Sequence, residues 1–179
     1  MSKVAVLQTS PESVMEDYGQ LMNLAGYQDV LNPAHPLNLK INISWQKFYP
    51  ACSTPPWQLD AVIRTLLNDG YPKDLISGVH NRTVVVSAKT GEVRNPHKPV
   101  LEKHDIRNVH LYESDEEWIT YHPKGRILVL DEIFPQGYKI PKRLMGSNII
   151  HLPTMKTHVF TTITGAMKNA FGGLLHNKR

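Results

Sequence analysis

The chain has 179 residues, of which 41% are apolar and 20% are charged, a composition that fits one ordinary globular domain. Its 20 basic and 16 acidic side chains leave a net charge of +4 without any long basic run, which argues against a nucleic-acid partner. Cys52 is the only cysteine, so an intrachain disulfide is excluded and this chain alone does not hold an iron–sulfur cluster.

The periodicity of the apolar residues predicts strands that alternate with helices. Strands are predicted at 3–8, 39–44, 83–87, 109–112, 126–130 and 148–152. Helices are predicted at 12–25, 57–69, 100–104 and 162–171, the first two with an apolar face toward the sheet. This alternation is typical of an α/β fold, here a three-layer sandwich with a mostly parallel sheet that spans residues 1–179 as a single domain.

No apolar run approaches the ~18 residues of a membrane span, and the N-terminus lacks the pattern of a secretory signal. We therefore expect a cytoplasmic protein without a membrane partner. The chain ends directly after its most polar segment, with no further strand, so we expect the sheet to be incomplete at the C-terminus. Self-association would then cover an exposed apolar surface near 163–175, formed by Met167, Phe171, Leu174 and Leu175.

The segment 151–173 carries the strongest indication of a binding site. An apolar run stops at Pro153, and a polar loop with Lys156 and His158 leads into the last predicted helix. Helix N-termini suit anions, because their N–H groups are free and the helix dipole is positive there. We predict a pocket for a carboxylate or phosphate, with Lys156, Lys168 and His158 as candidate catalytic residues. The predicted ligand-binding residues are Asn42, Trp45, Thr164, Gly165 and Asn169.

Within this pocket, Lys156 and Lys168 would neutralise charge and His158 would transfer protons. Thr164 and Lys168 are four residues apart, so they are expected to share a helical face. The alternative for the whole segment is a capped surface helix with solvated lysines. For Trp45, packing in the core is as good an interpretation as a wall of the pocket.

Two other polar clusters are better interpreted as turns. His80-Asn81-Arg82 could present an imidazole and a guanidinium to an acidic ligand, but Asn81 also suits a turn, which we favour. Asp131-Glu132 could bind a metal or act as a base, although solvated turn residues are the favoured interpretation. The nine histidines show no metal-ligand spacing, so no metal site is predicted.

The motif Pro153-x-x-Lys156-x-His158, followed by Thr164-Gly-x-x-Lys-Asn-x-Phe-Gly172, resembles the signature of the domain-of-unknown-function family 362. Lys40-Ile-Asn42 and Thr54-Pro-Pro56 resemble weaker parts of the same pattern. The resemblance implies that the chain is the N-terminal part of a longer family domain. Many members carry a ferredoxin-like module with cysteines for iron–sulfur clusters, but the single Cys52 does not support transferring that label.

Two classes of function follow from these features. The first is an enzyme domain that binds a small anionic ligand around 153–169 and that, by its resemblance to the family, would be part of a redox-linked enzyme. The second is a non-catalytic module that binds such a ligand or a partner protein, for instance a redox partner. A third alternative is a truncated fragment without activity. The sequence names neither the reaction nor a cofactor.

Overall fold

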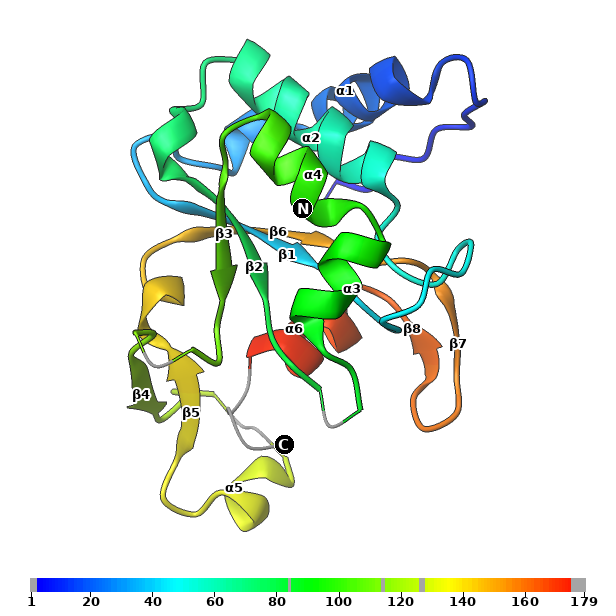
Figure 1. Ribbon diagram of the computed structural model, residues 1–179. Helices are drawn as coiled ribbons and strands as arrows, with labels where there is room; N and C mark the ends of the chain where they lie inside the picture. The colour runs from blue at the N-terminus through cyan, green and yellow to red at the C-terminus, as the bar shows by residue number, and fades with distance from the viewer. Residues whose placement is uncertain (1–2, 84, 114, 126–127, 175–179) are drawn as a thin grey trace.

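A four-stranded parallel sheet forms the centre of the computed structural model, which describes residues 3–83, 85–113, 115–125 and 128–174 (Figure 1). Its spatial strand order is β3-β2-β1-β6, and all neighbouring strands are parallel. The strands are β1 (Leu37–Ile41), β2 (Ile76–His80), β3 (Arg107–His110) and β6 (Asn148–Leu152). Because the strands are parallel, their carboxyl ends meet at one edge of the sheet, where α/β proteins place their ligands.

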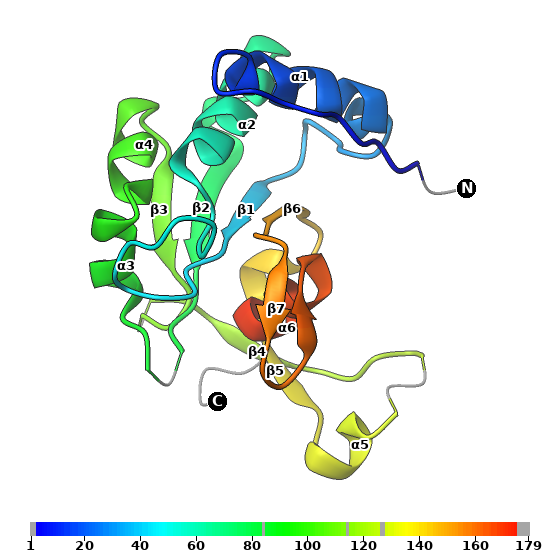
Figure 2. The ribbon, with the colours of Figure 1, turned by 90° about the vertical axis from the view of Figure 1, so that its right-hand side faces the viewer.

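Helices cover both faces of this sheet. Helix α2 (Pro56–Asn68) and helix α4 (His97–Lys103) lie above it in Figure 1, while α6 (Ala166–Leu174) lies below and contacts β6 and β1. Helix α1 (Val14–Ala25) packs on the outer side of α2, as Figure 2 shows, rather than directly on the sheet. The predicted three-layer α/β sandwich with a mostly parallel sheet is confirmed.

The core forms where β1 packs against α2. Leu37, Leu39 and Ile41 of β1 are fully buried, as are Leu59 and Ile63 of α2. Every residue of β1 is buried, which is typical of a central strand that has helices on both faces. Burial of such side chains is worth about 1.5–3 kcal/mol each, so this layer supplies a large part of the stabilising free energy.

The remaining elements extend beyond the central sheet. Two antiparallel ribbons pair β4 with β5 and β7 with β8. The other bounds are η1 (Tyr27–Asp29), η2 (Lys73–Leu75), α3 (Ala88–Arg94), β4 (Trp118–Tyr121), α5 (Leu130–Ile133), β5 (Tyr138–Pro141), η3 (Lys142–Leu144), β7 (Lys156–His158) and β8 (Thr162–Thr164).

The predicted strands at 3–8 and 83–87 are wrong, and β2 of the central sheet and the strands of the two antiparallel ribbons are missed. Residues 3–8 have no strand structure, and Val4 and Val6 are exposed, so their β-propensity has no sheet to join. Within 83–87 the described residues are not a strand, because the sheet uses β2 (Ile76–His80) instead. Gly78 lowers the β-propensity of this segment, so the sequence gives little sign of a strand. The structure shows why a glycine is needed: a Cβ atom at this position would lie 2.8 Å from Leu101 Cδ1 of α4.

The predictions for 126–130 and 162–171 also need correction. Of the first range, 126–127 lie outside the described residues, and 128–130 form a turn that enters α5. Asp131 and Glu132 are therefore exposed residues of α5 and do not follow a strand. The second range divides into β8 and α6. The threonine-rich run 161–164 has β-branched side chains that favour a strand over a helix.

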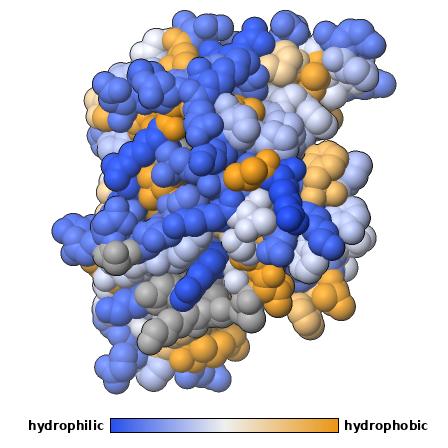
Figure 3. Space-filling model, viewed as in Figure 1, coloured by the Kyte–Doolittle hydropathy of each residue, from blue (hydrophilic) through white to orange (hydrophobic). Residues whose placement is uncertain are grey.

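The apolar surface predicted near 163–175 is present in part. Met167 and Phe160 are each 89% exposed, and Phe171 and Ile163 are also exposed. Figure 3 shows a mainly hydrophilic face with hydrophobic side chains over the region of the β7–β8 ribbon. The side chain of Leu174 and all of Leu175 lie outside the described residues.

Thr54, just before α2, connects β1 with β6. Its buried hydroxyl accepts a hydrogen bond from Asn42 N at 2.8 Å and donates one to the Leu152 carbonyl. We expect Thr54→Val to lower the free energy of unfolding by about 1–3 kcal/mol, because both backbone groups would lose this partner. Urea denaturation measures the change. The control is Thr157→Val at an exposed site, which we expect to change stability by less than ~0.5 kcal/mol. Equal stability of the two variants would contradict the prediction.

Candidate functional site

A pocket of about 500 Å³ lies at the carboxyl ends of β1 and β2. One wall consists of residues at these strand ends, and the other is supplied by the β7–β8 ribbon and α6. Its polar lining residues include Lys40, Asn42, His80, Asn81, Lys156, His158, Lys168 and Asn169. The pocket thus occupies the edge of a parallel sheet where loops from separate strands converge.

Two asparagines fix the positions of two lysines in this pocket. Lys156 Nζ donates to Asn42 Oδ1 at 3.1 Å, which connects β7 to the end of β1. Lys40, only 4% exposed, donates through Nζ to the Ile41 carbonyl at 2.7 Å and to Asn169 Oδ1 at 3.4 Å. Asn169 Nδ2 in turn donates to the Lys40 carbonyl at 3.0 Å. These bonds hold α6 against β1 and keep the ammonium groups in place.

The pocket is cationic. The described residues that line it include three lysines, Lys40, Lys156 and Lys168, and no carboxylate. Burial lowers the pKa of the half-buried Lys156, and the positive charge of Lys168 acts in the same direction. An anion placed between these two ammonium groups would relieve their repulsion and gain free energy.

His158 has a structural role in the β7–β8 ribbon. Its Nδ1 accepts hydrogen bonds from the backbone N–H of Phe160 at 3.2 Å and of Thr161 at 3.4 Å. The neutral ring therefore carries its proton on Nε2, and the side chain lines the pocket. Proton transfer by His158 remains a prediction, and Nε2 is the nitrogen that would carry it out.

Three of the predicted ligand-binding residues do not line the pocket. Trp45 is 37% exposed and lies outside the lining, and Gly165 is also absent from it. Thr164 is buried in β8, so the predicted helical face shared with Lys168 is wrong. Asn42, Lys156, His158, Lys168 and Asn169 do lie around the one pocket.

Sequence reasoning missed two polar lining residues of the central strands, Lys40 and His80, and their neighbour Asn81. Lys40 is a charged residue inside an otherwise apolar strand, and this was the signal available for it. His80 and Asn81 were interpreted as a turn, but His80 ends β2 and both residues line the pocket. This error follows from the failure to predict β2. Without that strand, the sequence does not show that His80 and Asn81 lie at the carboxyl edge of the sheet.

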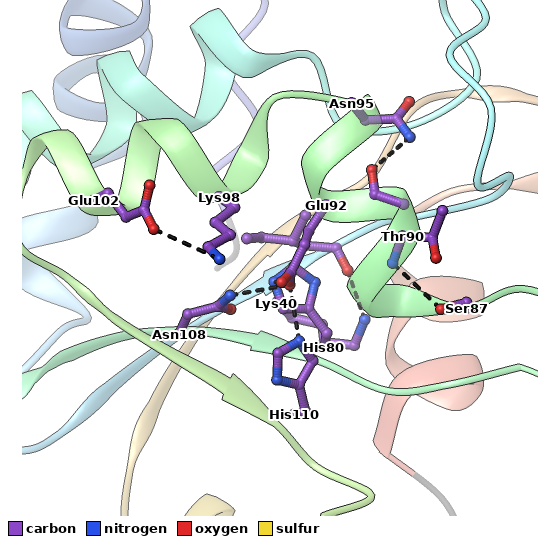
Figure 4. A network of polar contacts seen from close by, with 12 residues as sticks. Lys40, His80, Ser87, Thr90, Glu92, Asn95, Lys98, Glu102, Asn108 and His110 are labelled. Carbon is purple, nitrogen blue, oxygen red and sulfur yellow. Dashed lines mark hydrogen bonds and ion pairs between the residues drawn. The ribbon is translucent and has the colours of Figure 1, made fainter.

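Beside the pocket, a buried carboxylate is surrounded by imidazoles and an amide (Figure 4). Glu92 of α3 accepts hydrogen bonds from His110 Nε2 at 2.8 Å and from Asn108 Nδ2 at 3.0 Å. Burial would raise the pKa of Glu92, but these hydrogen bonds outweigh it and hold the pKa below its usual value. Glu92 is therefore a carboxylate at neutral pH, and His80 Nε2 lies 3.6 Å from it.

Within the described ranges, no group of three or more His, Cys, Asp or Glu side chains is arranged to hold a metal ion. Across the same ranges, every helix is too short or too polar to span a lipid bilayer.

The fold and the pocket define an α/β protein with a parallel sheet and a cationic pocket at its carboxyl edge. The model of a family described as a domain of unknown function, DUF362, matches residues 38–179, which is most of the chain. The chain therefore belongs to the DUF362 family. Neither the curated proteins nor the solved structures yield a match to the sequence.

Proposed function

We propose that the pocket binds a small anionic ligand, a carboxylate or a phosphate. One observation supports this most directly: the described lining residues include three lysines and no carboxylate. A pocket of about 500 Å³ is also of the size that small-molecule sites have.

The physical reason is the charge balance at the pocket. An ammonium group that has left water loses hydration, and amide oxygens replace only part of it. An anion between Lys156 and Lys168 would gain charge-assisted hydrogen bonds from both, at a dielectric constant lower than that of water. Asn42 and Asn169 would orient the ligand indirectly, by holding Lys156 and Lys40 in place.

We expect Lys156→Met to weaken anion binding about 10- to 100-fold, which corresponds to about 1.5–3 kcal/mol for a charge-assisted hydrogen bond. Methionine keeps the length of the side chain and removes its charge and donors. Isothermal titration calorimetry with phosphate, sulfate and succinate measures the effect. Lys168→Met is the parallel variant at the other predicted counter-charge, and a smaller loss is expected there if its ammonium is better solvated.

The matched control is Lys139→Met, at an exposed lysine of β5 that does not line the pocket. It makes the same change in net charge, so it reports the general electrostatic contribution. If Lys156→Met and Lys139→Met reduce the affinity equally, the anions bind through net charge alone and the proposed site is wrong.

A further inference from the structure

His80 is a buried imidazole with unused hydrogen-bonding capacity. It is 1% exposed and lines the pocket, yet neither ring nitrogen has a hydrogen-bond partner among the described residues. The neighbouring Asn81 also lines the pocket, and both polar atoms of its amide are buried without a partner. Leaving a buried polar group unpaired is unfavourable, so a group that pairs with these atoms on binding would gain free energy.

The groups around His80 restrict which part of its ring a ligand can reach. The rings of His97 and His110 stack against it, with centroids 6.4 Å and 5.6 Å away. The ring edge at Nε2 faces the Glu92 carboxylate, 3.6 Å from Oε2 (Figure 4). Two imidazoles therefore neighbour the ring, and Nε2 faces Glu92, so Nδ1 is the ring nitrogen left to pair with a ligand.

The protonation state of this ring follows from the same neighbours. Burial keeps the pKa of His80 well below its usual value; electrostatic coupling to His97, Lys40 and His110 acts in the same direction, and Asn108 acts in the opposite one. The ring is therefore neutral at pH 7 and carries one N–H. Attraction to the Glu92 carboxylate favours the tautomer with this proton on Nε2, so Nδ1 keeps its lone pair as an acceptor.

We propose that His80 accepts a hydrogen bond from the bound ligand through Nδ1, so that the pocket selects anions that carry an O–H group. This inference rests on the anion-binding function proposed above and adds the class of ligand. Hydrogen phosphate and hydroxycarboxylates have the required chemistry, whereas sulfate and unsubstituted carboxylates of the same charge lack it. A buried acceptor that loses its donor is left unpaired, and this discriminates against the analogue without the hydroxyl.

Two matched pairs of anions test the proposal. Hydrogen phosphate and sulfate have the same shape and charge at about pH 8, above the second pKa of phosphate. Malate and succinate are dicarboxylates that differ by one hydroxyl. By calorimetry, we expect the O–H member of at least one pair to bind the parent protein about tenfold or more tightly. The pair that shows the preference distinguishes a phosphate ligand from a hydroxycarboxylate.

The key variant is His80→Phe, which keeps an aromatic ring beside His97 and His110 and removes both nitrogens. We expect the preference to fall to near parity while sulfate and succinate bind as they do to the parent. If this variant does not fold by circular dichroism, Glu92→Gln provides the second test. It removes the charge that favours the Nε2 tautomer, and the preference should again decrease.

The outcomes separate this inference from the proposed function. Equal binding within both pairs by the parent overturns the role of His80 and leaves anion binding intact. A preference that persists in His80→Phe also overturns it. If none of the four anions binds the parent, both the proposed function and this inference are wrong.

Discussion

Leu101→Ala should lower the free energy of unfolding by about 2–5 kcal/mol, because this leucine of α4 is 1% exposed and fills the space above β2. Its methyl groups rest on Gly78, where a Cβ atom would lie 2.8 Å from Cδ1 and 2.9 Å from Cδ2. Truncation therefore leaves a cavity between the helix and the sheet. Urea denaturation at neutral pH measures the loss.

The pairing of Gly78 with Leu101 provides an internal control. Gly78→Ala alone should destabilise by about 1–3 kcal/mol, since the added methyl group overpacks the contact. In the double variant, the new methyl group occupies part of the cavity left by Leu101, so the combined loss should be smaller than the sum. Strictly additive losses would show that the two sites do not share this space.

Strands and helices with many buried apolar neighbours could be predicted from the sequence. The strand at 148–152 has the predicted bounds, and α2 differs from the prediction by one residue at each end. The segment 3–8 shows where prediction from β-propensity fails. This propensity describes how well a side chain fits a half-buried sheet surface, and it does not say whether a sheet is there. Val4 and Val6 have that propensity, but they lie outside the sheet and are exposed.

The site could be predicted only where its residues are close together in the chain. Lys156, His158, Lys168 and Asn169 belong to one segment, so their approach follows from local geometry. Lys40 and His80 reach the same pocket from two strands whose adjacency is determined by long-range pairing. The buried Glu92 lies on α3, and no local pattern indicates that it would face His80 and His110.

The buried imidazoles should make the protein lose stability in mildly acidic solution. Burial lowers the pKa of both His80 and His97, whereas an unfolded histidine titrates near ~6.5. His151, half-buried on β6, shows a shift of the same sign, caused by burial and by the charge of Lys40. Below about pH 6.5 the unfolded chain therefore binds protons that the folded protein excludes.

Stability is thus fully present above about pH 6.5 and decreases as the pH falls toward the lowered pKa values of the folded state. The slope should reach about 1.4 kcal/mol per pH unit for each such histidine, or roughly 2.7 for His80 and His97 together. The pKa of Glu92 is also lowered, but its contribution is lost only below the unfolded value of ~4.3, so the two effects separate on the pH axis.

Urea denaturation between about pH 8 and pH 5 measures this dependence, and His97→Gln tests its origin. His97 Nε2 is hydrogen-bonded to the Thr54 carbonyl at 2.6 Å, so the variant should already be less stable at pH 8, where both histidines are neutral. Below about pH 6.5 its stability should fall less steeply than that of the parent, by up to about 1.4 kcal/mol per pH unit. The reason is that the unfolded variant no longer has a His97 imidazole that binds a proton which the folded state excludes. A parent stability that is constant or increases as the pH is lowered to about 5 would show that these imidazoles accept protons in the folded state.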